Sequence, residues 1–282
     1  MKIKELLELL KEYHLPYTEQ ERTRDLVLCG DIEQECTGVA TTCCATLEVM
    51  QKAVEKGINF IISHEGITYN YEKGKVPVSE VENEVLQYKL NYASEHGLVV
   101  WRDHDHMHGD RPRDGLRIRP DMIFYGTMKE LGWEEYVVGD SKKPLLYKIP
   151  QTTVKQLAQD LMKAWNLNGL RVVGNTDCLV SSVFIAEHVI ASQWDGFDIS
   201  KMDMIDKADV FIPLEIVDYT LTSCVRDAAT MGKNKAILEM GHFNAEELGM
   251  KYLARELKEV FKEVDTVEFI QSGDTFSYLL RE

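Results

Sequence analysis

A strand, a helix and a strand in close succession near the N-terminus constrain the fold of this chain more than any other feature. The β-rich run GVATTC (38–43) precedes an amphipathic segment over 45–56, and the apolar run INFIIS (58–63) follows it. Gly57 marks the end of the helix, because glycine readily takes the left-handed conformation that closes a helix. Two strands connected through a helix lie parallel in one sheet, so these runs predict a βαβ unit.

The same alternation of helix and strand continues along the chain. A helix over 78–96 leads into a strand over 98–101, and a linker over 139–150 precedes a second region with its own elements. Further strands are expected at 25–30, 171–173, 183–186, 209–213, 236–239 and 266–270, and further helices at the N-terminus, 153–165 and 245–264. At about 150 residues per domain, 282 residues give two domains, so the sequence predicts an α/β fold of two lobes.

The acidic composition disfavours whole classes of partner. Lys and Arg number 32 against 47 Asp and Glu, a formal charge of −15, which repels nucleic-acid phosphates and anionic lipid surfaces. No apolar run approaches the roughly 18 residues of a membrane span, and the N-terminal pattern is an amphipathic helix without a signal-peptide core. We therefore expect a cytoplasmic protein with a small-molecule partner, and neither nucleic acid nor membrane.

Side chains that bind metals gather where three of the predicted strands end. In open α/β sheets the carboxyl ends of the strands form the crevice where ligands bind. The strand at 58–63 is followed by His64 and Glu65, and the strand at 236–239 by His242 and Glu246. The strand at 98–101 is followed by the densest group, which consists of Asp103, His104, Asp105, His106 and His108. Imidazole with carboxylate suits zinc, manganese or iron, and no cysteine lies near, so we expect an open metal site of the catalytic type.

The first two groups also have plainer explanations. The pair after 58–63 fits an ordinary loop, and the run 103–108 fits a solvated turn, although ligand atoms are unusually dense there. In extended geometry the three histidines of that run share one face, and not all of them can bind the same ion. His14, His96 and His188 lack ligand-type neighbours in the sequence, so surface, helix-end and strand positions account for them.

The third group, His242 and Glu246, allows two interpretations of the helix start. If the helix includes both residues, they lie one turn apart on one face. Alternatively, Asn244 and Glu247 form a capping box, so that the helix starts after His242 and Glu246 falls in its first turn. In the second case Glu246 is an acid favoured by the helix dipole and His242 a turn residue.

A group of arginines lies beside the second cluster in this otherwise acidic chain. Guanidinium groups match phosphate and carboxylate oxygens in paired geometry, so they are candidates to hold an anionic substrate. The alternative is pairing with neighbouring aspartates. The arginines are Arg102, Arg111, Arg113, Arg117 and Arg119, and the aspartates are Asp110, Asp114 and Asp121.

Three stretches together resemble a known family, the YbgI-like dinuclear-metal-centre proteins, many of which carry the name GTP cyclohydrolase I type 2. The stretches are INFIISHEG, the aspartate-rich turn after LVVW and, most specifically, EMGHFNAEELG. The resemblance extends in order from GVATTC to the C-terminal helix. It implies two α/β lobes whose mixed sheets face each other, a cleft between them that holds two metal ions, and a ring-shaped homo-hexamer. The first lobe is expected to comprise 1–140 with 240–282, and the second 141–239.

The resemblance also implies a set of metal ligands. The family's His-His pair falls on His64 and Glu65, so a carboxylate replaces an imidazole at the second position, which keeps a ligand but changes the charge. The family's aspartate matches Asp105, with Asp103 as the alternative. Its late histidine and glutamate fall on His242 and Glu246, and the glutamate is expected to bridge both ions.

These observations favour a dinuclear metal-dependent hydrolase with two divalent ions, zinc, iron or manganese. Such a pair lowers the pKa of a bound water and clamps developing charge on the substrate. His104 or His106 is the candidate general acid or base, and Arg102, Arg111 and Arg113 are the candidates to bind a small anionic substrate, phosphorylated or nucleotide-like.

Two other functions are compatible with the same residues. One is a non-catalytic metal-binding scaffold or regulatory ring protein, which is distinguished from the hydrolase by the lack of an open coordination position. The other takes His104 and His106 as the H-x-H motif of an amidohydrolase-type barrel. It is disfavoured because such a barrel has eight βα repeats with that motif near the first strand, whereas here at least three strands come before it.

Overall fold

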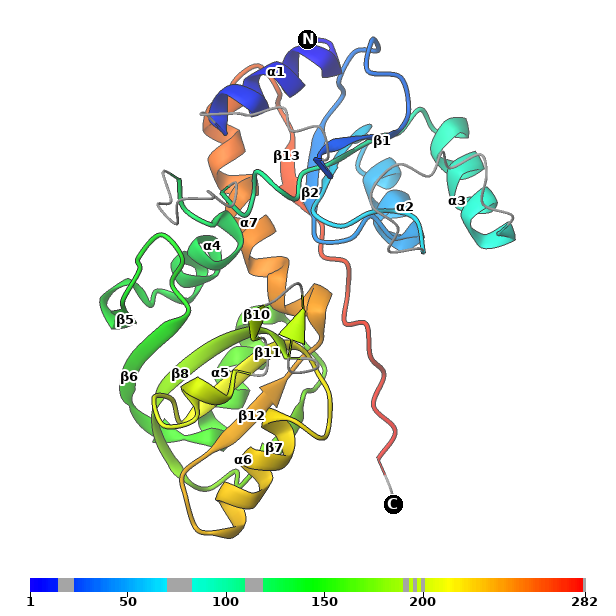
Figure 1. The fold of residues 1–282 in the computed structure, drawn as a ribbon. Helices are drawn as coiled ribbons and strands as arrows, with labels where there is room; N and C mark the ends of the chain where they lie inside the picture. The colour runs from blue at the N-terminus through cyan, green and yellow to red at the C-terminus, as the bar shows by residue number, and fades with distance from the viewer. Residues whose placement is uncertain are drawn as a thin grey trace. The chain divides into compact units, whose positions relative to one another are not determined.

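The structure is a computed structural model that describes residues 1–14, 23–69, 83–109, 119–189, 193–194, 197–198 and 201–280. The described chain forms two compact units (Figure 1). Unit 1 comprises 1–126 and 249–272, and unit 2 comprises 127–248 and 273–282. The chain passes from one unit to the other within helix α4 (Met122–Leu131), within helix α7 (His242–Val260) and after Ser272. The lobe boundaries expected after residues 140 and 239 stay a prediction.

Unit 1 is built on a five-stranded sheet of order β1-β4-β3-β2-β13. Its strands are β1 (Leu26–Cys29), β2 (Val39–Thr42), β3 (Phe60–Ser63), β4 (Val99–Arg102) and β13 (Val267–Phe269). All neighbours are parallel except the edge strand β1, which runs antiparallel to β4. The predicted βαβ unit is therefore present as β2, α2 (Leu47–Glu55) and β3.

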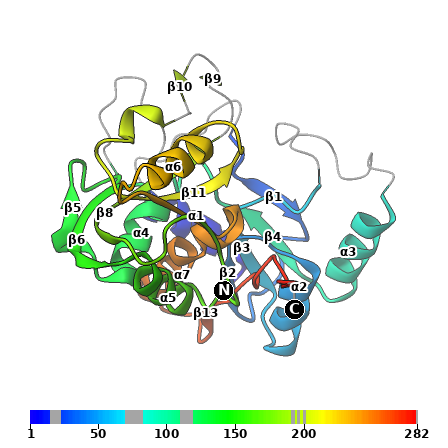
Figure 2. The ribbon, with the colours of Figure 1, turned by 90° about the horizontal axis from the view of Figure 1, so that it is seen from below.

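Helices cover both faces of this sheet. On one face α2 and α3 (Glu84–Glu95) lie side by side (Figures 1 and 2), where Met50 and Ala93 pack against Ile61 and Val100. On the other face the Thr41 hydroxyl donates a hydrogen bond of 2.7 Å to the Met250 carbonyl in α7. The N-terminal helix α1 (Ile3–Tyr13) also buries an apolar stripe in this unit. Among the described residues, both faces of the sheet are therefore covered by helices.

Unit 2 contains a six-stranded mixed sheet of order β5-β6-β8-β11-β12-β7. Strands β8, β11 and β12 are parallel neighbours, whereas β5, β6 and β7 are antiparallel to theirs. The strands are β5 (Val137–Val138), β6 (Leu146–Thr153), β7 (Arg171–Gly174), β8 (Leu179–Val189), β11 (Val210–Ile216) and β12 (Ala236–Glu239), with a separate ribbon of β9 (Gln193–Trp194) and β10 (Phe197–Asp198).

Successive residues of these strands point to opposite faces, and each face has its own helix. Val183 and Ile212 pack with α5 (Val154–Trp165) and with the start of α7. Phe184 and Phe211 pack instead with α6 (Leu221–Thr230), which runs along β7 and β12 (Figure 1). The 3₁₀ turns η2 (Glu134–Tyr136) and η3 (Met202–Met204) complete the unit.

The α/β class with two mixed sheets is as the sequence predicts, but some elements differ. The expected linker over 139–150 contains the start of β6, and Pro150 lies where the β6–β8 register shifts, a position that tolerates the missing N–H. Helices α4 and α6 were not predicted. Both sheets are open, so the barrel alternative is wrong. Among the described helices, none combines the length and apolarity that crossing a bilayer needs.

Candidate metal centre

The loop after β4 is organised by one buried carboxylate, Asp25. Its two oxygens accept backbone N–H groups from His104 at 2.6 Å, Asp105 at 2.8 Å and His106 at 3.0 Å. The imidazole of His106 also bonds Asp25 through Nδ1. Burial acts to raise the pKa of Asp25, but these hydrogen bonds outweigh it and hold the pKa below its ordinary value. Asp25 therefore remains charged and fixes the loop's conformation.

This loop brings three imidazoles together with the end of β3, and we call His64, His104 and His108 the unit 1 triad. The rings of His64 and His104 stack with centroids 4.5 Å apart and an interplanar angle of 10°. His108 meets both rings edge-on, at 5.0 Å from His64 and 4.8 Å from His104. One ring nitrogen of each residue lies within 4.8 Å of the others, a spacing that allows a shared metal ion.

Hydrogen bonds to Nδ1 orient two rings of the triad. Nδ1 of His64 donates to the Asp103 carbonyl at 3.1 Å, and Nδ1 of His108 is 3.1 Å from the buried carboxylate of Asp121. A carbonyl or carboxylate on one imidazole nitrogen is the usual arrangement that fixes a histidine whose other nitrogen binds a metal. The donor chemistry of the triad therefore fits a divalent ion.

His104 has different surroundings. Its Nδ1 is 3.3 Å from Asp105, and its Nε2 is 3.3 Å from the Arg24 guanidinium and 3.8 Å from Glu65. Burial, followed by the nearby imidazoles and arginines, lowers the pKa of His104 well below its ordinary value. The ring is thus neutral at pH 7, the form that accepts a proton or binds a metal.

The carboxylates predicted as ligands lie beside the triad and are engaged by other residues. Glu65 makes a salt bridge of 2.6 Å with Arg102, and Asp105 is clamped by Arg24, with 2.7 Å between Nη2 and Oδ1. Burial alone would raise the pKa of Asp105, but its hydrogen bonds and ion pair with Arg24 lower it. Whether either carboxylate binds a metal stays a prediction.

Two polar residues of this loop are bonded to side chains outside the triad. Asp103, the alternative ligand, bonds the buried His14 Nε2 at 2.8 Å, and His14 in turn contacts Arg119 at 3.1 Å. His106 is held by Asp25 and is almost completely buried. The contacts of His14 could not be seen in the sequence, because its partners lie about ninety positions away or more.

The arginine group is only partly described by the structure. Arg102 pairs with Glu65, and Arg119 contacts His14. Of the expected aspartate partners, Asp121 bonds His108 instead. Arg111, Arg113 and Arg117, with Asp110 and Asp114, lie outside the described residues. The predicted role of the arginines in substrate binding stays untested.

In unit 2 the structure decides how α7 begins. The helix starts at His242, and the Ala245 N–H bonds the Gly241 carbonyl at 3.0 Å. Asn244 thus lies inside the helix and not at its N-cap, so the capping-box interpretation is wrong, and the Asn244 amide donates to the Met240 carbonyl at 2.8 Å. His242 and Glu246 are therefore one turn apart, with 3.3 Å between Nε2 and Oε2.

A second cluster surrounds His242, and two of its members were missed from the sequence. Glu215, near the end of β11, bonds Nδ1 of His188 at 2.5 Å and lies 2.9 Å from Nδ1 of His242. Burial opposes charge on Glu215 and on His242. The carboxylates of Glu215 and Glu246 nevertheless raise the pKa of His242 to about 11, and the two imidazoles lower that of Glu215 to about 2. Both His188 and Glu215 lie close to the end of a predicted strand, and that position is the sequence feature that could have identified them.

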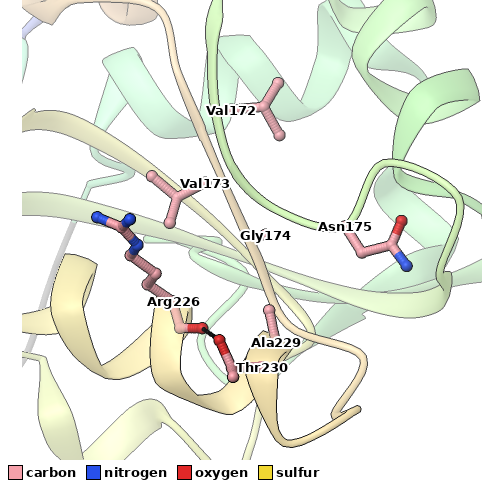
Figure 3. A pocket seen from close by; sticks show the side chains of 7 residues that line it. All are labelled: Val172, Val173, Gly174, Asn175, Arg226, Ala229 and Thr230. Atoms are coloured by element: carbon pink, nitrogen blue, oxygen red, sulfur yellow. Dashed lines mark hydrogen bonds between the residues drawn. The ribbon is translucent and has the colours of Figure 1, made fainter.

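A hollow of about 490 Å³ lies elsewhere in unit 2, between β7 and α6 (Figure 3). Arg226 is its single charged lining residue, and its carbonyl accepts a hydrogen bond of 3.0 Å from Thr230. The other lining residues are Val172, Val173, Gly174, Asn175 and Ala229. Lacking an imidazole or a carboxylate, this hollow offers no metal ligands and no acid–base pair.

Comparison with known sequences connects the chain to one family. Residues 1–98 match a family model described as Duf34/NIF3 (NGG1p interacting factor 3). A "GTP cyclohydrolase 1 type 2 homolog" of Staphylococcus aureus is 26% identical over 181 residues, which cover 62% of this chain and 44% of that protein. The chain thus spans less than half the length of that relative. A protein of the same name in Clostridium acetobutylicum is 20% identical over 260 residues. That alignment covers 92% of this chain and 90% of the Clostridium protein.

Solved structures share the fold. The protein ybgI, described as of unknown function, superposes with a TM-score of 0.64 at 18% identity over 97% of this chain and 98% of its own. The Staphylococcus aureus protein SA1388 gives a TM-score of 0.63 at 20% identity, with 99% of both chains covered. At these identities the likeness concerns the fold alone.

Proposed function

Because this chain is a YbgI/NIF3-like protein, we propose that it is a metal-dependent hydrolase acting on a small anionic substrate, phosphorylated or nucleotide-like. The observation that supports this proposal is the unit 1 triad, in which imidazoles from β3 and from the loop after β4 converge. The names of the relatives, which include the words GTP cyclohydrolase, are consistent with a nucleotide-like substrate.

We propose His64, His108 and Glu65 as metal ligands in unit 1. His64 and His108 carry the orienting hydrogen bonds on Nδ1, and the Arg102 salt bridge holds the Glu65 carboxylate in place. Asp105, His242 and Glu246 remain proposed ligands on the basis of the resemblance, as does the number of two ions. When bound, zinc, iron or manganese supplies a water of lowered pKa and polarises the substrate.

His104 is the better of the two candidates for the proton-transfer role. The ring of His104 is stacked parallel to that of His64, and the lone pair of an imidazole nitrogen lies in the plane of its ring. The lone pairs of the two rings therefore lie in parallel planes and do not converge on one ion. Nε2 of His104 lies beside the Arg24 guanidinium, which opposes a cation there. Neutral and adjacent to the ligands, His104 is suited to accept a proton, whereas His106 is occupied by Asp25 in the interior.

The test combines metal analysis with activity. The purified 282-residue chain is analysed for zinc, iron and manganese, reloaded after chelation, and screened against phosphomonoesters, phosphodiesters and nucleotides. We expect hydrolysis only by the loaded protein, loss of metal in His64→Ala, and retention of metal with at least a hundredfold lower kcat in His104→Gln. The matched control is His96→Ala, at the exposed end of α3.

Equal metal content and activity in His64→Ala would contradict the proposal. A loaded protein that hydrolyses none of these compounds would instead favour the non-catalytic alternative, a metal-binding scaffold or regulator. Loss of metal in His104→Gln would make His104 a ligand rather than the proton acceptor.

A further inference from the structure

The parallel strands of unit 2 each deliver one ligand-type side chain to the same sheet edge. His188 lies near the end of β8, Glu215 near the end of β11, and His242 directly beyond β12 at the start of α7. These strands are neighbours in the order β8-β11-β12 (Figure 1) and run parallel, so their carboxyl ends share one edge. Ligand sites form at this edge in open α/β sheets.

The three side chains meet there. One ligand atom from each of His188, Glu215 and His242 lies within 4.8 Å of the others. The two imidazoles pack edge to face with centroids 5.3 Å apart, and Glu215 contacts both of them. Glu246, one turn along α7, lies 3.3 Å from Nε2 of His242 and adds a second carboxylate.

The backbone of β8 is distorted where it presents His188. Glu187 has a φ of 55°, in the left-handed region that few residues other than glycine adopt. The pairing of β8 with β11 is irregular at this point, because Ile185 pairs with Ile212, Glu187 with Pro213 and His188 with Glu215. The two shifts cancel, so His188 lies opposite Glu215 in the same register as the regular part of the two strands. The side chain of Glu187 is bonded by Lys143 and Lys201. Backbone strain of this kind is found next to functional sites.

Charge and accessibility both suit a cation. The two carboxylates carry a charge of −2, which a divalent ion balances when it takes the place of the proton on His242. Borderline ions such as zinc and cobalt favour this mixture of nitrogen and oxygen donors. The side chains of His188, Glu215 and His242 are 31%, 38% and 30% exposed, so an ion reaches them from solvent. Glu246 is only 2% exposed and supplies the buried wall.

We propose that His188 and Glu215 are further ligands of a divalent cation at this edge of unit 2, beside His242 and Glu246. His242 and Glu246 are also proposed ligands of the dinuclear centre, so in their case the inference rests on the proposed function. The roles of His188 and Glu215 do not depend on whether the unit 1 triad binds metal.

The test removes the unit 1 ligands first. The double variant His64→Ala/His108→Ala of the 282-residue chain is titrated with Co²⁺, and binding is followed by visible absorption of the bound ion and by calorimetry. We expect it to bind one Co²⁺ per chain. Adding His188→Ala or Glu215→Gln to this background is expected to weaken Co²⁺ binding at least tenfold, whereas adding His96→Ala leaves it unchanged.

The outcomes separate this proposal from the proposed function. A double variant that binds no Co²⁺, or an unchanged affinity after His188→Ala and after Glu215→Gln, overturns the unit 2 site. Equal stoichiometry in the wild type and the double variant counts against the unit 1 centre while leaving this site standing. Circular dichroism checks that each variant folds. If His188→Ala does not fold, the isosteric variant Glu215→Gln tests the proposal alone.

Discussion

At the scale of single residues, Asp25 illustrates a role that only the folded chain reveals. Its carboxylate accepts three backbone N–H groups from the loop that carries the histidine run, and those groups lie about eighty positions away in sequence. The sequence showed that His64, Glu65 and the run 103–108 were dense in ligand atoms. It could not show which of them face each other, because that depends on contacts between distant segments.

Replacing Asp25 with asparagine is expected to reduce stability in a pH-dependent way. The folded pKa of Asp25 lies below its ordinary value, so its charged form stabilises the fold above the unfolded pKa of about 3.9 and this contribution is lost as the pH falls through the folded pKa. At pH 7 the variant should lose about 2–3 kcal/mol of unfolding free energy. Urea unfolding between pH 3 and pH 7 measures both effects, with the exposed Asp203→Asn as the control. Parallel curves for Asp25→Asn and the wild type would refute the assignment.

Asp121 offers a second test at this scale, independent of catalysis. Its buried carboxylate is 3.1 Å from Nδ1 of His108, the contact that orients a metal-binding imidazole. If His108 is a ligand, Asp121→Asn should weaken metal affinity by about 10-fold to 100-fold. Competition with a chromophoric chelator measures this change, and the exposed Asp177→Asn is the matched control. An affinity equal to that of the wild type would remove His108 from the ligand set.

At the scale of elements, the strands were more predictable than the helix ends. Short apolar runs such as 58–63 and 236–239 coincide with β3 and β12 because strands buried on both faces carry a plain hydrophobic signature. The start of α7 was left open between two interpretations. Asn244 and Glu247 have the right spacing for a capping box, but the helix already begins at His242, with the Ala245 N–H bonded to the Gly241 carbonyl. Asn244 therefore lies inside the first turn, where its amide donates to the Met240 carbonyl and to Asp274, a residue thirty positions away.

The crossing of α4 and α7 in unit 1 gives a prediction about stability. A Cβ on Gly249 would lie 2.5 Å from the Ile123 Cα and 2.8 Å from its carbonyl oxygen. Alanine in a helix interior ordinarily stabilises by about 1 kcal/mol relative to glycine. Here the close backbone approach should reverse the sign, so Gly249→Ala is expected to cost about 1–3 kcal/mol. Thermal unfolding measures it, with Gly66→Ala, whose nearest neighbour would be an ordinary contact at 3.6 Å, as the control. A raised midpoint for Gly249→Ala would disprove the close packing.

At the scale of the whole molecule, the sequence predicted the α/β class, whereas the lobe boundaries expected after residues 140 and 239 stay a prediction. Alternating helices and strands indicated two α/β parts, and two mixed sheets are present. The compact units, however, change within α4 and α7, which are continuous helices. A composition shift or a run of loop residues cannot mark a boundary that lies inside a helix. Packing against two different sheets defines it instead.

The resemblance to the YbgI-like proteins also predicts the assembly. We expect a homo-hexamer, six chains of 32.3 kDa each. Light scattering coupled to size exclusion measures the mass at micromolar concentration, in low and in moderate salt, because the charge of −15 makes subunits repel most strongly at low ionic strength. A monomer in both buffers would contradict the expectation.

The continuity of α7 has a consequence for how this chain can change over evolutionary time. Its 19 residues run from His242, among the ligand-type residues of unit 2, to Val260, past the Met250 carbonyl that caps the Thr41 hydroxyl in unit 1. Each residue added to or removed from an α-helix turns one end by about 100° relative to the other. An insertion or deletion between His242 and Met250 would therefore turn one of these residues away from its own contacts, and we expect descendants of this chain to conserve the length of that segment.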